Sequence, residues 1–320
     1  MYKYILKRLL WMIPIVLGVG VIVFTILYFS PGDPAALLLP PDATDADKLA
    51  LRHTLGLDQS YFEQLFTFLK NTFIKFDLGS SWVTNATVSG ELIDRVPRTL
   101  LLTSLCLLLS VVVGVPIGIL AAVKQNRWQD QTSIFFSLLG VSLPNFWLAL
   151  LLVLLFSVKL HWLPAMGMKG FEYYILPALA GGMGAIAMQA RQTRSSMLEV
   201  IRSDYITTAR AKGVKEISVI FRHALPNALI PVITLAGITF GTSMGGTIIL
   251  ESIFAIPGVG LYIVGGIGNR DLPIVRGGSV FLAIAFSLCM LLVDIIYSLV
   301  DPRIKAMYSG GRRRKKHAKV

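Results

Sequence analysis

Long apolar runs separated by short polar segments fill the chain from near its first residue to about residue 300. The first run, from Leu9 to Phe29, contains no charged residue over 21 positions. At about 1.5 Å per residue, a helix of this length crosses the roughly 30 Å hydrocarbon core of a bilayer. We therefore predict that this run forms a membrane-spanning helix.

Five further apolar runs have the length of a spanning helix, which gives six predicted spans. They are Thr99 to Val123, Ser133 to Val158, Tyr173 to Ala190, Ala228 to Leu250 and Gly278 to Val300. Glycines interrupt the run that begins at Tyr173, and small residues there favour close packing of neighbouring helices. The pattern predicts an all-α integral membrane protein.

The composition supports a lipid environment. Hydrophobic residues make up 54% of the chain and charged residues 15%, with a mean hydropathy of +0.68, which is more apolar than soluble domains. The net charge of +12 raises the alternative of a nucleic-acid partner, because the tail is strongly basic. We expect no nucleic acid, since a basic segment after a last span is typical of a cytoplasmic flank. The basic tail residues are Arg312, Arg313, Arg314, Lys315, Lys316 and Lys319.

The sequence contains no recognisable site for metal, redox or covalent chemistry. Cys106 and Cys289 lie within apolar runs, where a thiol behaves as a small hydrophobic group. The histidines are scattered singly, and no phosphate-binding Gly-x-x-x-x-Gly-Lys-Ser/Thr loop is present. Asp294 is the one acid inside a predicted span, and we expect it to pair with a nearby arginine or with the tail. These observations disfavour an enzyme.

The distribution of Lys and Arg predicts the orientation. Most of the 30 basic residues fall before the first span, in alternate loops and in the tail, whereas Lys159, Lys169, Arg270 and Arg276 are the basic residues of the other two short loops. Short basic loops stay in the cytoplasm, so both termini should lie there. The long segment 30–98 then lies outside. Leu65, Phe66, Leu69, Phe73 and Phe76 recur in it at helical spacing, which predicts a small helical cap on the outer face; a mere connector is the alternative.

Residues 191–227 are the most informative stretch. Ser203 can cap a helix that has Asp204 in its first turn, and Gly213 can end it in a left-handed conformation. This predicts a short helix from about Asp204 to Lys212, on which Ala209 and Ala211 leave room for another surface. A second amphipathic helix begins at Val214, and Leu225-Pro226-Asn227 should end it. The result is a helix-turn-helix elbow in the cytoplasm.

The elbow resembles the EAA loop of ABC importer permeases, whose pattern is Glu-Ala-Ala, then a glycine, then Ile-x-Leu-Pro. Ala209, Gly213, Leu225 and Pro226 match this pattern, while Thr207, Thr208 and His223 stand where it has glutamate, alanine and isoleucine. The form Thr208-Ala209-Arg210-Ala211-Lys212-Gly213 with His223-Ala224-Leu225-Pro226 is similar to the dipeptide, oligopeptide and nickel branch of these permeases.

Other segments resemble the same branch, in order along nearly the whole chain. They are Arg8-Leu9-Leu10, Pro31-Gly32-Asp33-Pro34, Leu55-Gly56-Leu57-Asp58, Asp77-Leu78-Gly79, Ser142-Leu143-Pro144-Asn145-Phe146, Pro257-Gly258-Val259-Gly260, Arg270-Asp271 and Asp301-Pro302-Arg303. The resemblance implies a chain with residues 1–29 as tail and first span, 30–98 as outer helical segment, 99–300 as a five-helix permease core, and 301–320 as cytoplasmic tail.

The resemblance also implies partners and a role. The elbow would dock on a cytoplasmic ATPase through Asp204, Tyr205, Thr208, Ala209, Arg210, Ala211, Lys212, Gly213, His223, Leu225 and Pro226. A second permease, two ATPase subunits and an extracytoplasmic binding protein would complete an importer in a prokaryotic cell membrane. ATP and Mg would be bound by the ATPase subunits, and this chain would bind no cofactor. Alternating access of peptides, or of nickel complexes or another small solute, would follow.

Two other classes of function remain as alternatives. An ion-coupled secondary transporter would need acids within the membrane or inverted repeats in one chain, and apart from Asp294 and Glu251 at a span end neither is visible. A membrane-embedded enzyme would need a catalytic cluster at one depth, and the sequence suggests none. The residues that line the path, and the solute itself, are not readable from the sequence.

Overall fold

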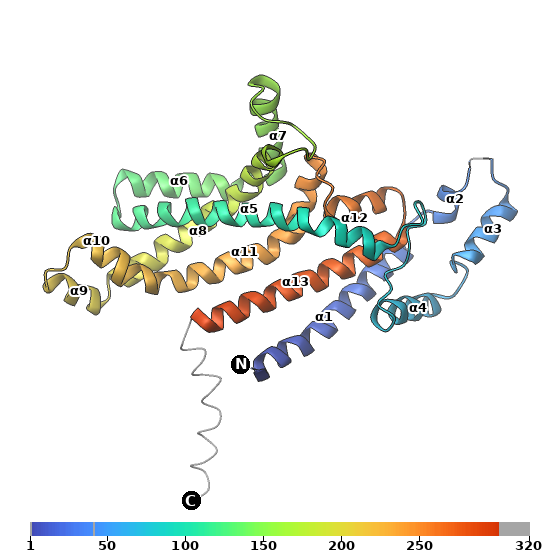
Figure 1. Ribbon diagram of the computed structural model, residues 1–320, viewed down its shortest axis with the longest axis horizontal. Helices are drawn as coiled ribbons and strands as arrows, with labels where there is room; N and C mark the ends of the chain where they lie inside the picture. The colour runs from blue at the N-terminus through green and yellow to red at the C-terminus, as the bar shows by residue number, and fades with distance from the viewer. Residues whose placement is uncertain (1, 41, 301–320) are drawn as a thin grey trace, which may run out of the picture.

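The computed structural model describes residues 2–40 and 42–300, which form helices joined by turns, with no β-strand among these residues beyond an isolated bridge between Ser80 and Thr87 (Figure 1). The elements are α1 (Tyr2–Tyr28), α2 (Pro34–Leu38), α3 (Asp45–Thr54), α4 (Tyr61–Phe73), α5 (Val88–Val123), α6 (Trp128–Ser142), α7 (Asn145–Leu152), η1 (Val153–Lys159), η2 (Phe171–Tyr174), α8 (Ile175–Ile201), α9 (Asp204–Ala211), α10 (Glu216–Ser218), η3 (Val219–Ala224), α11 (Leu225–Ile253), α12 (Val259–Gly268) and α13 (Leu272–Val300). The predicted tail, 301–320, lies outside the described residues.

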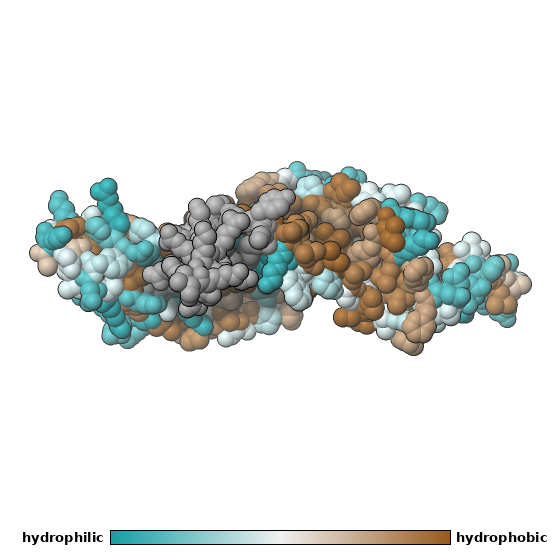
Figure 2. Space-filling view, turned by 90° about the horizontal axis from the view of Figure 1, so that it is seen from below, coloured by the Kyte–Doolittle hydropathy of each residue, from teal (hydrophilic) through white to brown (hydrophobic). Residues whose placement is uncertain are grey.

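An apolar belt lies between two polar ends of the elongated molecule (Figure 2). Within the described residues, four helical stretches are long and apolar enough to cross a membrane: Ile5–Tyr28, Val88–Val123, Glu216–Ile253 and Leu272–Ile295. They confirm that four of the predicted runs lie in helices long and apolar enough to span a membrane, although the bounds of these helices differ from the predicted ones. A fifth is reached if α6 and the helix after it count as one broken span. The count of six is not confirmed, because α8 is not among these stretches.

The predicted span from Ser133 to Val158 is not one continuous helix. α6 ends at Ser142, Leu143 is extended with φ −84° and ψ 124°, and α7 leaves Pro144 at 100° to α6. The cause is local, since proline disfavours helical geometry in the residue before it. α7 continues as the π-helix η1 to Lys159 and projects from the bundle (Figure 1).

The predicted boundary at residue 99 also differs from the structure. α5 begins at Val88, so the last part of the predicted outer segment belongs to a helix of 36 residues. Pro97 lies inside this helix. The first turns of the helix carry charged residues, so the apolar run begins later than the helix does. These residues are Glu91, Asp94, Arg95 and Arg98. The outer segment does contain the predicted amphipathic helix, as α4, together with α2 and α3.

α5 and α8 form the closest helix pair and run parallel. A Cβ added to Gly114 would lie 2.8 Å from the carbonyl oxygen of Ile186, and one added to Gly118 would lie 2.5 Å from that of Ala190. Two glycines four residues apart thus let the backbones approach, as in small-residue packing of membrane helices. α6 packs on a neighbouring side of α8, where Gly140 faces Ala187.

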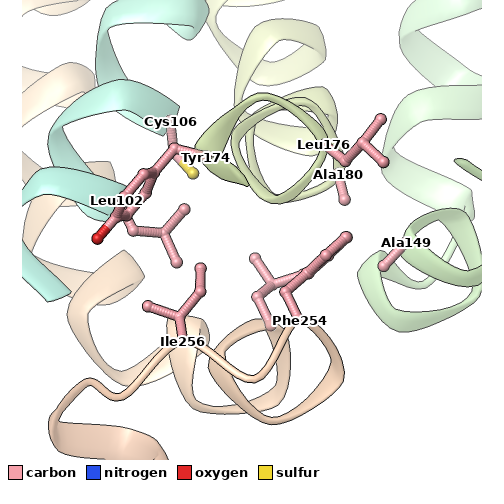
Figure 3. Close-up of a cluster of buried hydrophobic side chains, with 9 residues drawn as sticks. Leu102, Cys106, Ala149, Tyr174, Leu176, Ala180, Phe254 and Ile256 are labelled. Atoms are coloured by element: carbon pink, nitrogen blue, oxygen red, sulfur yellow. The ribbon is translucent and has the colours of Figure 1, made fainter. Parts of the chain in front are cut away.

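A buried apolar cluster joins α5, α7, α8 and the end of α11 (Figure 3). It contains Leu102, Cys106, Ala149, Tyr174, Leu176, Ala180, Leu250, Phe254 and Ile256. At another side of the molecule α1 packs on α13, and Arg8 Nη2 pairs with Asp294 at 2.9 Å. This pair confirms the expectation that Asp294 meets a nearby arginine.

We expect Gly118→Ala to destabilise the fold, because the new methyl group would overlap the α8 backbone. Overpacking of this kind costs about 1 to 3 kcal/mol. Gly245→Ala in α11 is the matched control, since a Cβ there has no neighbour within 4 Å. Thermal unfolding in detergent should show a lower midpoint for the first variant and an unchanged or higher one for the second. Equal midpoints would contradict the close contact.

Candidate functional site

The elbow lies at the end of the bundle opposite to α2, α3 and α4, and we call these two ends the elbow end and the cap end (Figure 1). α8 stops at Ile201, and α9 spans Asp204–Ala211, close to the predicted Asp204 to Lys212. Asp204 lies in the first turn, as expected. Ser203 occupies the N-cap position of α9, as predicted, but its hydroxyl donates to the carbonyl of Val200 at 2.6 Å and makes no capping hydrogen bond.

Gly213 ends this helix in the left-handed region, with φ +76°, as the sequence predicts. Its amide donates to the carbonyl of Arg210 at 2.9 Å, and the amide of Val214 donates to that of Ala209 at 3.3 Å. A Cβ at Gly213 would meet nothing within 4 Å. The requirement for glycine at this turn is therefore conformational and does not come from crowding.

The second helix of the elbow does not end at Leu225-Pro226-Asn227, and this prediction is wrong. α10 passes through the π-helix η3 directly into α11. Pro226 stands at the start of α11, and the wide π turn before it accommodates a residue that has no amide hydrogen to donate. The second helix of the elbow is thus the first part of a long helix and not a separate surface helix.

The inner face of the elbow packs on its own chain. Ile206 is fully buried in an apolar cluster with Ala122, Met197, Val219, Ile220, Ala224 and Ala228. Ala209 and Leu225 pack against the same cluster and are half-buried. The expectation that Ala209 leaves room for another surface is therefore not met, because its side chain faces this chain's own core.

The outer face is polar and exposed. It brings together the other predicted site residues, namely Asp204, Tyr205, Thr208, Arg210, Ala211, Lys212, Gly213, His223 and Pro226. Ala211 rather than Ala209 is the small side chain that faces outward. Since Lys212, Lys215 and Arg222 are exposed nearby, the face is cationic and suits a partner with acidic groups.

Hydrogen bonds fix the shape of the elbow across the turn. Arg210 donates to both carboxylate oxygens of Glu216, at 2.7 and 3.1 Å. This bond to Glu216 raises the pKa of Arg210 above its ordinary value, so the guanidinium stays charged. Asn227 Nδ2 donates to the Tyr205 hydroxyl at 2.7 Å, which ties α9 to the start of α11.

An ion pair that the sequence analysis missed supports the base of the elbow. Asp130 of α6 is 2% exposed and accepts hydrogen bonds from Arg194 Nε at 2.5 Å and Nη2 at 2.8 Å, in the last turns of α8. The amide of Asn126 donates to the same carboxylate at 3.0 Å. The partners are far apart in sequence and show no shared motif, so no sequence signal could have paired them.

A second missed contact lies at the cap end. Glu251 is fully buried and accepts hydrogen bonds from Thr99 Oγ1 at 2.7 Å and from the amide of Leu261 at 2.9 Å. The carboxylate thereby caps the first turn of α12, a helix that the sequence analysis did not predict. An acid at the end of an apolar run is the one signal that points to it.

These features give the elbow an exposed polar face that is held from behind by a buried apolar cluster. In the part of the chain that is described, no three His, Cys, Asp or Glu side chains gather so that they could hold a metal ion. The groups that face outward at the elbow are charged, hydroxyl and small side chains on a short helix, held by a buried cluster behind them. Such an arrangement can bind a partner and transmit its movement.

The chain matches two family models that together cover most of its length. Residues 114–306 match the inner membrane component of binding-protein-dependent transport systems, and residues 1–103 match the N-terminal part of such membrane components. Solved structures share the fold. One chain of the inward-facing MetNI methionine ABC transporter superposes with a TM-score of 0.56 at 23% identity, covering 66% of this chain and 96% of that one. One chain of an amino acid ABC transporter gives 0.52 at 15% identity, with 67% and 94% covered.

Curated relatives match over nearly their whole length. The glutathione transport system permease protein GsiC of Escherichia coli K12 is 40% identical over 306 residues, which is 95% of this chain and 99% of the relative. The protein of the same name from Salmonella choleraesuis is 42% identical over the same length. The chain therefore belongs to the family of inner-membrane permease components of binding-protein-dependent ABC importers, a family of transport proteins and not of enzymes.

Proposed function

We propose that this chain forms half of the path of a peptide importer, together with a second, related permease. Two ATPase subunits would bind at the elbow end and supply ATP and Mg, and a substrate-binding protein would bind at the cap end. The family assignment supports this composition in general terms, since such permeases work with ATPase and binding-protein partners. Substrate would cross by alternating access, as one bistable arrangement of helices gives way to another.

The coupling role is proposed because α9 has one side buried in its own chain and another side exposed. Ile206 anchors the helix in the buried cluster, while Asp204, Thr208, Ala211 and Lys212 stay exposed on the other side. A helix held this way can enter a cleft on an ATPase and pass its displacement to the bundle without bending. The Arg210–Glu216 pair would keep the elbow rigid during this movement.

Peptides are the proposed substrate class. The relatives at 40 to 42% identity are named for transport of glutathione, which is itself a tripeptide, and this favours short peptides over nickel complexes. Both termini would lie in the cytoplasm, because the basic loops and the elbow share one end of the bundle.

Uptake by the assembled complex in vesicles would test the substrate class. We expect labelled glutathione or a short peptide from a defined panel to accumulate in an ATP-dependent way. Nickel, offered alone and with small chelators, should not accumulate above the level without ATP. Uptake of nickel without any peptide uptake would favour the alternative.

Gly213→Val should uncouple ATP hydrolysis from uptake while the complex still assembles. A β-branched residue forced into the left-handed region costs about 1 to 2 kcal/mol, and about 1.4 kcal/mol corresponds to a tenfold change, so we expect uptake to fall by about tenfold. Gly213→Asn is the matched control, because asparagine tolerates this conformation and should preserve uptake.

Ala211→Glu should act in the same direction through the exposed face, by adding charge and bulk where the ATPase would dock. If both Gly213→Val and Ala211→Glu transport at the normal rate in an intact complex, the elbow is not the coupling element.

The proposed orientation predicts which thiols an impermeant reagent reaches. In a chain with Cys106 and Cys289 replaced, Asp45→Cys on α3 should react in intact cells, because Asp45 is exposed at the cap end. Lys212→Cys at the elbow should react only after the membrane is opened. The reverse labelling pattern would show that the proposed orientation is wrong and that the cap end lies in the cytoplasm.

A further inference from the structure

α4 (Tyr61–Phe73) is a short helix with three distinct faces. At 100° per residue, Tyr61 and Phe68 fall on the side that packs against α1. Glu63, Thr67 and Lys70 fall on a polar side. The third side forms a stripe about 60° wide that consists of Phe62, Phe66, Leu69 and Phe73, which we call the aromatic stripe.

Two large apolar side chains of the aromatic stripe are mostly exposed. Phe62 is 78% exposed and Phe66 is 68% exposed, while Leu69 and Phe73 are half-buried. Removing a phenylalanine ring from water is energetically favourable. Two such rings, four residues apart on one helix, therefore indicate a surface that is covered in the working protein.

Contacts with α1 give the depth of α4. The Tyr61 hydroxyl lies 2.8 Å from Thr25 Oγ1, and the rings of Phe68 and Phe24 stack at 5.6 Å. Deeper still, a Cβ at Gly20 would lie 3.6 Å from Phe68 and 3.7 Å from Phe73. Gly20 stands eight residues before the end of the span Ile5–Tyr28, or about 12 Å along the helix axis. Side chains of α4 therefore reach well into the apolar thickness of the bundle.

The exposed face of α1 continues onto the aromatic stripe. Ile22, Ile26 and Phe29 share one side of α1 and are 59%, 63% and 72% exposed. The Phe29 ring lies 6.0 Å from the Tyr61 ring, which in turn lies 5.2 Å from the Phe62 ring. Since α1 is a membrane-spanning helix whose outward side chains meet lipid, this row of rings extends the same surface to α4.

We propose that the aromatic stripe of α4 is a lipid-binding surface, immersed among acyl chains in the leaflet at the cap end of the bundle. The polar side with Glu63, Thr67 and Lys70 then faces headgroups and water, as in helices that lie in a membrane interface. Phenylalanine and leucine are typical of the apolar face that such helices bury at the boundary between headgroups and acyl chains. The predicted cap is in this respect an anchored element and does not rest above the membrane surface.

The assignment changes the role of residues 30–87. A helix held in the bilayer fixes the position of the neighbouring α2 and α3, which carry the exposed polar surface of the cap end. The proposal depends on the membrane span of α1 alone. It is independent of the elbow and of the substrate.

Spin labels would test the proposal in the assembled complex reconstituted in phospholipid vesicles. Phe66→Cys places a label on the aromatic stripe, and Thr67→Cys is the matched control, one residue further on the exposed polar side. Both variants start from a chain with Cys106 and Cys289 replaced. We expect the label at 66 to collide readily with oxygen and at least about threefold less with a water-soluble nickel chelate than the label at 67.

Two outcomes would overturn the proposal. Equal access of the nickel chelate to both labels would place the stripe in water. Low collision of the label at 66 with both reagents would mean that a protein surface, such as the second permease, covers the stripe. If Phe66→Cys fails to assemble, Phe62→Cys on the same stripe gives the same comparison.

Discussion

The close approach of α5 and α8 is the contact on which the rest of the structure depends. In lipid, burial from water does not draw helices together, so association relies on van der Waals contact between closely fitted surfaces. Gly114 and Gly118 provide this fit against the α8 backbone at Ile186 and Ala190. Because α8 continues beyond the contact to the elbow, the same two glycines determine where α9 stands relative to the bundle.

Acidic side chains lie at the contacts between helices. Asp130 meets Arg194 where α6 joins α8, Arg8 meets Asp294 where α1 joins α13, and Glu251 meets Thr99 and the first turn of α12. An unpaired carboxylate in an apolar interior costs several kcal/mol, whereas a paired one holds its neighbours in a fixed geometry. A structural role therefore accounts for these acids, and an ion-coupled transport mechanism is not required to explain their presence.

The sequence predicts well what depends on local chemistry. The apolar runs locate α1, α5, α11 and α13, and the position of Gly213 predicts its left-handed turn. Prediction from the sequence fails where the structure depends on neighbouring residues. The run from Ser133 to Val158 is predominantly apolar and does not indicate the bend at Pro144. Pro226 predicts the end of a helix, although the preceding π turn accommodates it. The inward side of Ala209 and the pairing of Asp130 with Arg194 arise only from tertiary packing.

α11 connects the two ends of the molecule in the proposed importer. The helix has 29 residues and so extends about 44 Å. Near its start Asn227 binds Tyr205 of the elbow, and near its end Glu251 caps α12 at the cap end. A packed interior shifts between discrete arrangements and does not deform gradually. A displacement of α9 would therefore reach α12 as movement of one rod, because both ends of that rod are fastened by hydrogen bonds to the elements they must move.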